Sequence, residues 1–356
     1  MKIKDILQIK YGKNQSSVID ENGKYPIIGT GGIFGYATKY LYNKPSVLIG
    51  RKGSINNPMY VDTPFWTVDT LFYTIIDTSK IIPRWFYYYI STLNLNKFNE
   101  GTTIPSLTTK TLYEIDVPEH SLNYQQHIVD IIGSLDDKIE NNNKIIEKLQ
   151  RKIDFIFNQF YTNILESDIF IKCKLKEYAK KIITGTTPST KEDKYWGNSI
   201  DFITIPDMQN NVYVLDTIRK LSTECEKSFN NRIVPKNSIA ISCIATVGLV
   251  SIIPHNAITN QQINSVIFND ENDCYYFYEL FKTMKENLIQ LGSGGSATLN
   301  INKNIFSNIE VIVPYKNEME QFCKKTNSLF ELILSLTKEN TKLNDLKQLY
   351  LKKFFG

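Results

Sequence analysis

The side chains with the most distinctive chemistry in this sequence are basic and amide groups set in glycine- and tyrosine-rich loops. Lysine and arginine neutralise phosphate groups, and arginine can also donate two parallel hydrogen bonds to guanine. Arg51 and Lys52 directly follow a predicted buried strand, where a loop can project them from the surface. The candidate nucleic-acid contacts in the first third of the chain are Lys13, Gln15, Lys24, Lys39, Arg51 and Lys52.

A second set of such residues follows residue 185. Asparagine and glutamine amides can pair with the edge of adenine, and threonine and lysine can contact phosphates. The candidates are Thr186, Thr187, Lys191, Tyr195, Trp196, Gln209, Asn210, Asn260 and Gln261. Each of them, taken singly, also fits a solvated surface or a turn. The prediction therefore depends on finding the whole collection on corresponding loops of two similar halves.

No recognisable catalytic or nucleotide-binding motif accompanies these loops. The G-x4-G-K-[ST] pattern is absent, and residues 29–35 fail the GxGxxG spacing because Phe34 stands where the third glycine belongs. Residues 57–60, Asn-Pro-Met-Tyr, differ at one position from the Asn-Pro-Pro-Tyr signature of amino-methyltransferases, whose companion cofactor motif is absent. We expect no catalytic site and no cofactor on this chain.

Composition sets wider bounds on the protein. The 356 residues suggest two or three domains, and a net charge of +4 with a pI of about 8.5 is compatible with a polyanionic partner. Three histidines and five cysteines without a CxxC pair argue against a metal site, and scattered cysteines suit a reducing cytoplasm. The sequence starts without a secretory signal and contains no convincing membrane span, so we expect a cytoplasmic protein.

Residues 122–165 predict a long coiled-coil helix. This stretch contains no proline, and its apolar residues recur with a seven-residue period over more than four heptads. The predicted seam on this helix comprises Ile132, Ile139, Asn142, Ile146, Leu149, Ile153 and Phe160. Two explanations of Asn142 remain open, because an amphipathic helix tolerates one polar residue, whereas a seam asparagine can also fix register and pairing.

The second half of the chain repeats the first in order and spacing. Residues 46–56 align with residues 238–248, and residues 66–71 align without a gap with residues 258–263. Chance similarity between short β-rich runs is the alternative explanation. It does not account for a long predicted helix at the end of each half, so we infer a duplicated unit of globular block and helix.

The helix that ends the second half carries a seam of its own. Residues 101–107 resemble residues 294–299, and after them each half passes through a Val-Pro dipeptide into its helix. The predicted seam on the second helix comprises Leu329, Leu336, Glu339, Leu343, Leu346 and Tyr350. Glu339 aligns with Asn142, so the two polar residues can meet if the helices pair antiparallel. A parallel pair would bring both blocks to the same end, where they would collide.

These patterns predict an α+β fold, with two similar mixed α/β blocks separated by two long helices that form an antiparallel coiled coil. The expected segments are a first block, a central helix, a second block and a C-terminal helix, over residues 1–121, 122–165, 166–315 and 316–356. Predicted strands lie at residues 47–49, 71–76, 239–241 and 263–268, and predicted amphipathic helices at residues 83–95 and 275–291.

The residues that lead into the first helix carry the most specific motif. Val117-Pro118 is followed by Gln125-Gln126 and by residues 134–144, Ser-Leu-Asp-Asp-Lys-Ile-Glu-Asn-Asn-Asn-Lys. Weaker motifs lie at residues 25–29, 48–53, 185–189 (Gly-Thr-Thr-Pro-Ser), 195–197 (Tyr-Trp-Gly) and 259–263. With these motifs the whole chain resembles the specificity subunits of type I restriction–modification enzymes.

The resemblance implies two target recognition domains that each read one half of a split double-stranded DNA sequence. It also implies that the paired helices form a spacer and a docking surface for two modification (methyltransferase) subunits, which restriction (helicase-nuclease) subunits then join. S-adenosylmethionine and ATP would be bound by those partners. The two halves differ where residues 12–16 replace Gly-Thr-Thr-Pro-Ser and where Cys243-Ile244 replace Arg51-Lys52, as expected if they read different bases.

Two other functional classes compete with a DNA-reading adaptor. A non-catalytic coiled-coil scaffold that binds proteins but not DNA explains the helices but not the two decorated blocks. A fused methyltransferase or nuclease is disfavoured by the missing motifs. For the adaptor, we expect the helix surface around Asp136 and Asp137 to bind the protein partners, because the specific motif at residues 134–144 lies there.

Overall fold

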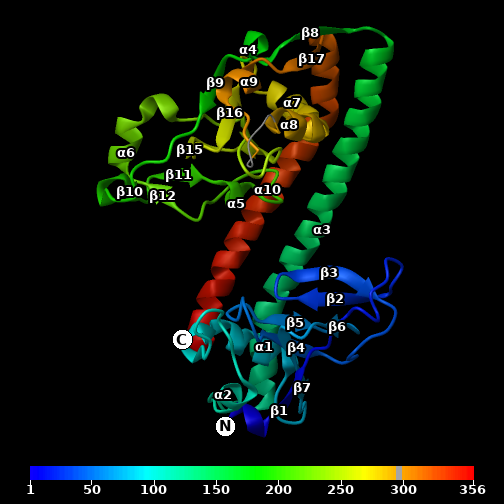
Figure 1. The fold of residues 1–356 in the computed structure, drawn as a ribbon, viewed down its shortest axis with the longest axis vertical. Coiled ribbons are helices and arrows are strands. Elements are labelled where there is room, and N and C mark those ends of the chain that lie inside the picture. The colour runs from blue at the N-terminus through cyan, green and yellow to red at the C-terminus, as the bar shows by residue number, and fades with distance from the viewer. Residues whose placement is uncertain (294–298) are drawn as a thin grey trace. The chain divides into compact units, whose positions relative to one another are not determined.

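The computed structural model of the protein describes residues 1–293 and 299–356. The chain divides into two compact units, unit 1 with Met1–Glu140 and Lys342–Gly356, and unit 2 with Asn141–Thr341. Both predicted long helices are present as α3 (Leu122–Glu166) and α10 (Lys316–Phe355), and each contributes residues to both units (Figure 1). The two units are described separately below.

Unit 1 is built on an antiparallel four-stranded sheet with the order β1-β7-β4-β5. These strands are β1 (Leu7–Tyr11), β7 (Leu71–Ile76), β4 (Ser46–Gly50) and β5 (Met59–Val61). A three-stranded sheet with the order β3-β2-β6 contains β3 (Gly32–Ala37), β2 (Tyr25–Gly29) and β6 (Trp66–Thr67). The helices of the block are η1 (Ile3–Asp5), α1 (Pro83–Thr92), η2 (Leu95–Phe98) and α2 (Thr109–Tyr113).

The core of unit 1 joins the four-stranded sheet to α1 and to the parts of α3 and α10 that belong to this unit. Helix α1 starts at Pro83, whose fixed φ favours a first helical turn. Its Trp85 and Tyr88 are completely buried, in one apolar cluster with Ile132 of α3 and Leu351 of α10. The globular block and the parts of the two helices in unit 1 therefore share one core.

Unit 2 contains two four-stranded sheets. The first has the order β14-β13-β16-β9, formed by β14 (Val250–Ile253), β13 (Ser238–Ser242), β16 (Ile263–Ile267) and β9 (Lys181–Thr184). The second, which we call the outer sheet, has the order β10-β12-β11-β15, formed by β10 (Trp196–Gly197), β12 (Lys220–Leu221), β11 (Ile200–Ile203) and β15 (Ala257–Thr259). Strands β8 (Phe170–Lys174) and β17 (Glu310–Pro314) pair with each other.

The helices of unit 2 include one that the sequence predicts as continuous and the structure divides. The predicted helix over residues 275–291 is α7 (Asp273–Thr283) followed by α8 (Lys285–Gly292). The shorter helices are α4 (Leu175–Tyr178), η3 (Asp193–Tyr195), α5 (Ile205–Met208), α6 (Thr223–Ser228), η4 (Asn230–Arg232) and α9 (Lys303–Ser307).

The predicted duplication is present in the sheet topology. The order β1-β7-β4-β5 of unit 1 corresponds strand for strand to β9-β16-β13-β14 of unit 2, and both sheets are antiparallel throughout. The predicted strands at residues 47–49, 71–76, 239–241 and 263–268 are β4, β7, β13 and β16. The predicted match between residues 101–107 and 294–299 lies largely outside the described residues.

The helices pair antiparallel, as the contacts within unit 2 demonstrate. Asn142, 1% exposed, donates from Nδ2 to Glu339 Oε2 at 2.7 Å and to Asn340 Oδ1 at 2.9 Å. Farther along α3, the rings of Phe157 and Phe160 contact Phe322 of α10. Residue numbers thus rise along α3 while they fall along α10. The predicted contact between Asn142 and Glu339 is confirmed, and Asn340 joins it.

The predicted seam is correct on α3 and displaced on α10. Ile132 and Ile153 are at most 1% exposed, and Ile139, Ile146, Leu149 and Phe160 are half-buried. On α10, Leu346 is 40% exposed, so its assignment to the seam is wrong. Leu329, Leu336, Leu343 and Tyr350 are only half-buried, whereas the more deeply buried positions are Phe330, Ile333, Asn340 and Leu351. The buried positions on α10 differ from the predicted ones because α10 packs against the globular blocks as well as against α3.

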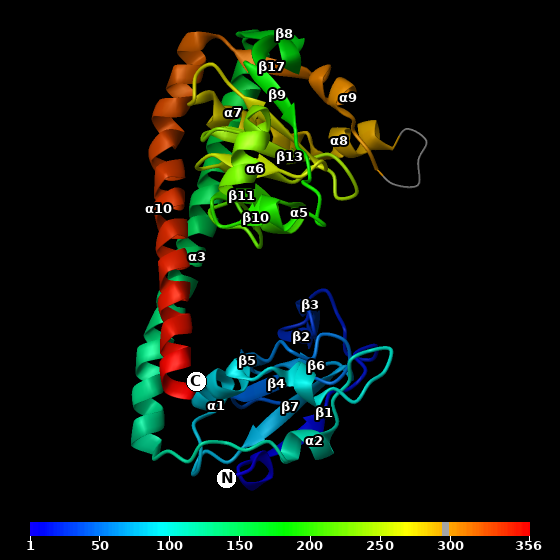
Figure 2. The same cartoon turned by 90° about the vertical axis from the view of Figure 1, so that its left-hand side faces the viewer.

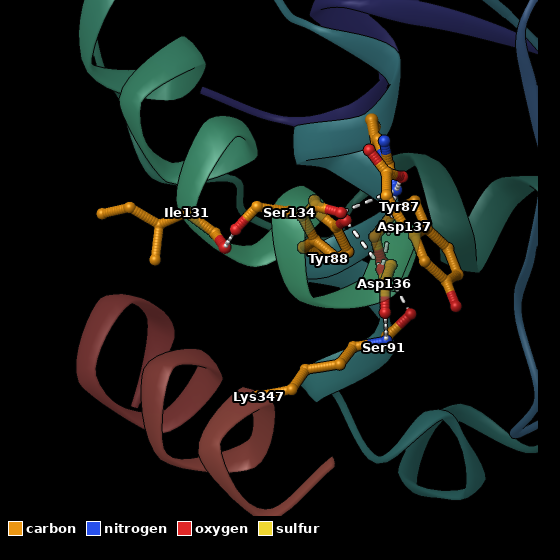
Figure 3. Close-up of polar contacts among 10 residues, drawn as sticks. Tyr87, Tyr88, Ser91, Ile131, Ser134, Asp136, Asp137 and Lys347 are labelled. Carbon is orange, nitrogen blue, oxygen red and sulfur yellow. Dashed lines mark hydrogen bonds and ion pairs between the residues drawn. The ribbon is translucent and has the colours of Figure 1, made fainter. Parts of the chain in front are cut away.

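A buried ionic contact fixes α1 to both long helices in unit 1 (Figure 3). Asp136 of α3 accepts the Tyr88 hydroxyl at 2.8 Å and the Lys347 ammonium at 2.6 Å, and its side chain is 23% exposed. Arg84 pairs with the neighbouring Asp137 at 2.8 Å. Burial, with the Asp136 charge beside it, raises the pKa of Tyr88, so that this hydroxyl stays protonated and donates. We call Asp136, Tyr88 and Lys347 the unit 1 brace.

The buried amide contact between the helices predicts a stability effect. Asn340→Ala should lower the free energy of unfolding by about 1–3 kcal/mol, because Asn142 loses an acceptor and Asn143 loses the donor that reaches it at 2.8 Å. Chemical denaturation followed by circular dichroism measures the change. The exposed Asn141→Ala is the matched control and should stay within about 0.5 kcal/mol of the wild type. Equal effects of the two variants would contradict the assignment.

The unit 1 brace gives a second prediction. Tyr88→Phe should destabilise the protein by about 1.5–3 kcal/mol, because it removes a hydrogen bond to a largely buried carboxylate. Tyr87→Phe is the control on the same helix, since the hydroxyl of half-buried Tyr87 has no hydrogen-bond partner among the described residues. Thermal unfolding of the two variants side by side checks this expectation, which fails if Tyr87→Phe is the more harmful change.

Candidate nucleic-acid interface

An exposed hairpin of aromatic and apolar side chains stands out in unit 1. Strands β2 and β3 form it, and the turn uses Gly32 at a φ of 104°, a conformation that glycine adopts without strain. On β3, Ile33, Phe34 and Tyr36 are 60%, 52% and 47% exposed. The Phe34 ring lies across Gly29, where a Cβ would approach it to 3.1 Å. Aromatic faces of this kind stack on bases or sugars, and the sequence analysis did not single them out.

The candidate lysines of unit 1 are available for a ligand. Lys13, Lys24, Lys39 and Lys52 are exposed, and none has an ion-pair partner among the described residues. Their backbones are nevertheless fixed. The Lys13 carbonyl accepts from Trp66 Nε1 at 2.9 Å, and the Lys24 amide donates to the Ala37 carbonyl at 3.0 Å. Ordered backbones with unpaired ammonium groups suit contacts to phosphates.

Gln15 and Arg51 are more constrained than the lysines. Gln15 is half-buried, and its carbonyl accepts the amides of Val18 and Ile19 at 2.9 Å. Arg51 is half-buried, donates from Nη1 to the Asp69 carbonyl at 2.9 Å, and places Cζ 5.2 Å from the centre of the Tyr11 ring. The guanidinium is therefore oriented before any ligand arrives, and its remaining N–H groups can still donate.

In unit 2, the loops after β9 and β15 lie against each other. Gly185 is required there, because a Cβ would meet the Asn260 carbonyl oxygen at 2.0 Å. The Thr187 hydroxyl hydrogen-bonds the Gln261 side chain, and the Thr186 amide donates to Thr259 at 2.8 Å. Thr187 and Gln261 are exposed, and Thr186 is half-buried.

Asn260 is buried, unlike the exposed Gln261 that follows it in the sequence. It is 8% exposed, donates from Nδ2 to Gln262 Oε1 at 3.0 Å, and accepts the Gln262 amide at 3.1 Å. Its side chain is used to hold the loop, so Gln261 is the residue of this pair that can reach a ligand.

The loop that carries Lys191, Tyr195 and Trp196 is held by its aromatic rings. Trp196 Nε1 donates to the Ser189 carbonyl at 3.2 Å, and the Tyr195 ring packs against Phe229 at 5.6 Å. Lys191 is exposed, whereas the two aromatic residues are half-buried. Both rings stabilise the loop, and one face of Trp196 is covered by a cation.

That cation is Arg219, which the sequence analysis missed. Its Cζ lies 4.1 Å from the centre of the Trp196 ring, and the residue is exposed. Arg219 follows no strand signal and shares no motif with Trp196, so only the pairing of β10 with β12 brings the two together. It is an additional candidate contact to phosphate or base.

Gln209 and Asn210 lie at the end of α5 and are exposed. Asn210 adopts a φ of 62°, a left-handed conformation that asparagine tolerates. Asn210 and Asn211 line one side of a cavity of about 440 Å³ whose other side includes Lys282 and Lys285. Lys282 pairs with Asp154 of α3 and with Glu279, whose pKa burial raises to about 8. Lys285 is exposed and has no ion-pair partner among the described residues.

The outer sheet of unit 2 is fastened by a buried carboxylate. Asp201 is 6% exposed, accepts Lys220 at 3.0 Å and the Thr217 hydroxyl at 3.1 Å, and contacts His255 Nε2. Burial alone would raise the pKa of Asp201, but the hydrogen bonds from His255 and Lys220 keep it below its usual value. This group positions β11 and β12, and Arg219 directly precedes β12.

The helix surface at residues 134–144 is only partly available to a partner. Asp136 belongs to the unit 1 brace, and Asp137 pairs with Arg84, so both carboxylates already have partners within unit 1. The role of this surface in binding partner subunits stays a prediction. Within unit 2, Ile145 and Phe155 of α3 are 42% and 61% exposed.

Metal-binding clusters and membrane-spanning helices are both absent from the described part of the chain. Among residues 1–293 and 299–356, no group of three or more His, Cys, Asp or Glu side chains is placed to hold a metal ion. Over the same residues, no helix combines the length and apolar character needed to cross a membrane.

Comparison with known proteins identifies the family. The family model described as "Type I restriction modification DNA specificity domain" matches residues 1–151 and again residues 170–348. The specificity subunit of the type I restriction enzyme HindI from Haemophilus influenzae is 28% identical, over 84% of this chain and 83% of its own. The MjaVIII specificity subunit from Methanocaldococcus jannaschii is 21% identical over 98% and 89%.

A solved structure has the same fold. The crystal structure of the S subunit of a type I restriction–modification system from M. genitalium superposes with a TM-score of 0.65 at 15% identity, over 100% of this chain and 95% of that one. The duplicated blocks, the paired helices and the twofold match of the family model lead to one conclusion. This chain belongs to the family of type I restriction–modification DNA specificity proteins.

Proposed function

We propose that this chain is the DNA sequence-specificity subunit of a type I restriction–modification complex and has no catalytic activity of its own. Residues 1–121 and 166–315 are the two target recognition domains, and each reads one half of a two-part double-stranded DNA target. The observation that carries this proposal is that the family model matches twice, and that each matched half presents exposed, unpaired cations on ordered loops.

The protein partners follow from the helices. The segments at residues 122–165 and 316–356 dock two modification (methyltransferase) subunits, to which restriction (helicase-nuclease) subunits add. Exposed Ile145 and Phe155 on α3 support a role for the helix surface in protein binding. A scaffold that bound proteins but not DNA would have no use for the unpaired lysines of unit 1.

Cofactors and compartment complete the proposal. S-adenosylmethionine and ATP are bound by the partner subunits and not by this chain, whose sequence lacks recognisable motifs for either. The protein works in the cytoplasm, where its target DNA lies. Its five cysteines are all unpaired thiols, which suits a reducing compartment.

DNA binding by the assembled complex should depend steeply on salt. Neutralisation of about four phosphates predicts that affinity falls about 10²-fold when NaCl rises from about 50 to about 200 mM. Fluorescence anisotropy with a labelled duplex that contains the complex's own target measures this dependence. The scaffold alternative predicts no specific binding at any of these salt concentrations. Affinity that stays level across the range would argue against phosphate contacts by the loops.

Arg51 and Lys52 should affect recognition differently. Arg51→Ala should reduce discrimination at one base pair by about 1–3 kcal/mol, because an oriented guanidinium can read a base edge. Lys52→Ala should weaken binding about equally for all sequences, as expected of a phosphate contact. Competition assays with duplexes substituted at single positions separate these effects. Lys97→Ala removes an exposed lysine outside the candidate set and is the control. Unchanged discrimination in Arg51→Ala would assign that residue to the structure of the loop alone.

A further inference from the structure

A cavity of about 520 Å³ opens in unit 2 where α10 begins. Its walls come from β8, α4, the loop before α7, the end of β17 and the first two turns of α10, which Figures 1 and 2 place together. The floor is apolar and includes Val313 and Met319. Ile171 and Tyr315 also line the cavity, and they are 45% and 50% exposed. The cavity can therefore receive an apolar group from outside.

The charged groups of this cavity are mainly acidic. Asp270, Asp273 and Glu320 line it together with one cation, Lys316. None of the three carboxylates has an ion-pair partner within 4.0 Å among the described residues. Phosphate would be repelled by this arrangement, so the cavity is not part of a DNA-binding surface.

Asp273 is the most informative of these groups. It is 7% exposed, and its Oδ2 accepts the Tyr178 hydroxyl at 2.7 Å, whereas Oδ1 has no hydrogen-bond partner among the described residues. Burial raises the pKa of Asp273 to about 6, so the group is mostly ionised at neutral pH. Its place in the first turn of α7 favours the negative charge and burial disfavours it, so a cation that enters the cavity would stabilise the ionised form.

Unit 1 shows how the corresponding place is closed. There Gln125, near the start of α3 and 1% exposed, donates to the carbonyls of Lys80 and His120 and accepts the Ile82 amide. In unit 2 the shorter Cys323 of α10 reaches the carbonyl of Asn272, in the loop before α7, at 3.8 Å.

We propose that this cavity docks an arginine or lysine side chain presented by the modification subunit. The aliphatic stem of such a residue lies on the apolar floor, and its charged end reaches Asp273 and Glu320. A protein side chain is favoured as the occupant because α10, which forms one wall of the cavity, is assigned to docking of the modification subunit. The inference rests on the proposed function, because the wall of the cavity is the start of a helix assigned to docking.

Charge reversal at the rim tests this site. Glu320 is exposed, and Glu320→Arg should weaken binding of the purified modification subunit about tenfold or more, because it places like charge against the incoming cation. Glu331→Arg makes the same change on an exposed position of α10 outside the cavity, and its affinity should stay within about twofold of the wild type. Isothermal titration calorimetry with the full chain measures both. Equal affinities of the two variants overturn the proposal.

A neutral variant separates docking from folding. Asp273→Asn keeps an oxygen that can accept the Tyr178 hydroxyl and removes the buried charge. It should bind the modification subunit about fivefold or more weakly while its unfolding temperature is at least that of the wild type. Loss of affinity together with a lower unfolding temperature would mean that Asp273 is structural, and it overturns the proposal.

The partner residue can be found by charge exchange. Arginine-to-glutamate and lysine-to-glutamate variants of the modification subunit are each combined with Glu320→Arg. One of them should restore affinity to within about threefold of the wild-type pair, and failure of every one overturns the assignment. A wild-type chain that does not bind the modification subunit at all would instead refute the proposed function.

Discussion

The structure depends most on the pairing of α3 with α10, and this pairing contains a polar contact in a buried place. Asn142 is 1% exposed, and both of its hydrogen bonds to α10 are donated by Nδ2, to Glu339 and Asn340. A slipped register would set the amide against an apolar side chain, and an unsatisfied buried amide costs about 1–3 kcal/mol. The contact therefore selects one alignment among the several that a repeating apolar seam allows.

Each globular block needs this alignment for its own core. In unit 1, Leu351 of α10 belongs to the same apolar cluster as Trp85 and Ile132. In unit 2, Ile153 of α3 and Ile333 of α10 are both part of the cluster that contains β13 and β16. In each unit, therefore, the core of the block includes residues of both long helices.

The two units share a topology but fasten their helices with different chemistry. In unit 1, Asp136 of α3 accepts hydrogen bonds from Tyr88 and Lys347. In unit 2, Lys282 of α7 forms ion pairs with Asp154 of α3 and Glu279 of α7. Buried ion pairs add little net stability compared with apolar packing, but loss of one partner is costly because a charge is left behind. Both groups therefore fix the position of a block on its helices more than they raise the free energy of unfolding.

Sequence patterns predicted the features that repeat over many residues. Heptad periodicity located both helices, and the internal alignment predicted both the antiparallel pairing and the contact of Asn142 with Glu339. The assignment of Leu346 to the seam was wrong, because heptad periodicity locates apolar positions on a helix but does not indicate which neighbouring element each position faces. The outer sheet was missed because β10 and β12 have two residues each, too few to show alternation. Asp136 and Arg219 acquire their roles from partners that are distant in sequence.

Charged residues that form ion pairs within the chain stabilise the fold, whereas those without an ion-pair partner can bind a ligand. Lys2 and Lys4 both form ion pairs with Glu114, which lower the pKa of that carboxyl to about 2. These surface charges are therefore matched within the chain. Lys13, Lys24 and Lys52 lie on hydrogen-bonded backbones and, like Lys39, are left without such a partner among the described residues. An unpaired ammonium group on an ordered loop loses little conformational freedom in the backbone when a phosphate binds. Asp273 likewise has no cation beside it among the described residues, and the proposed docking of a basic side chain would supply one.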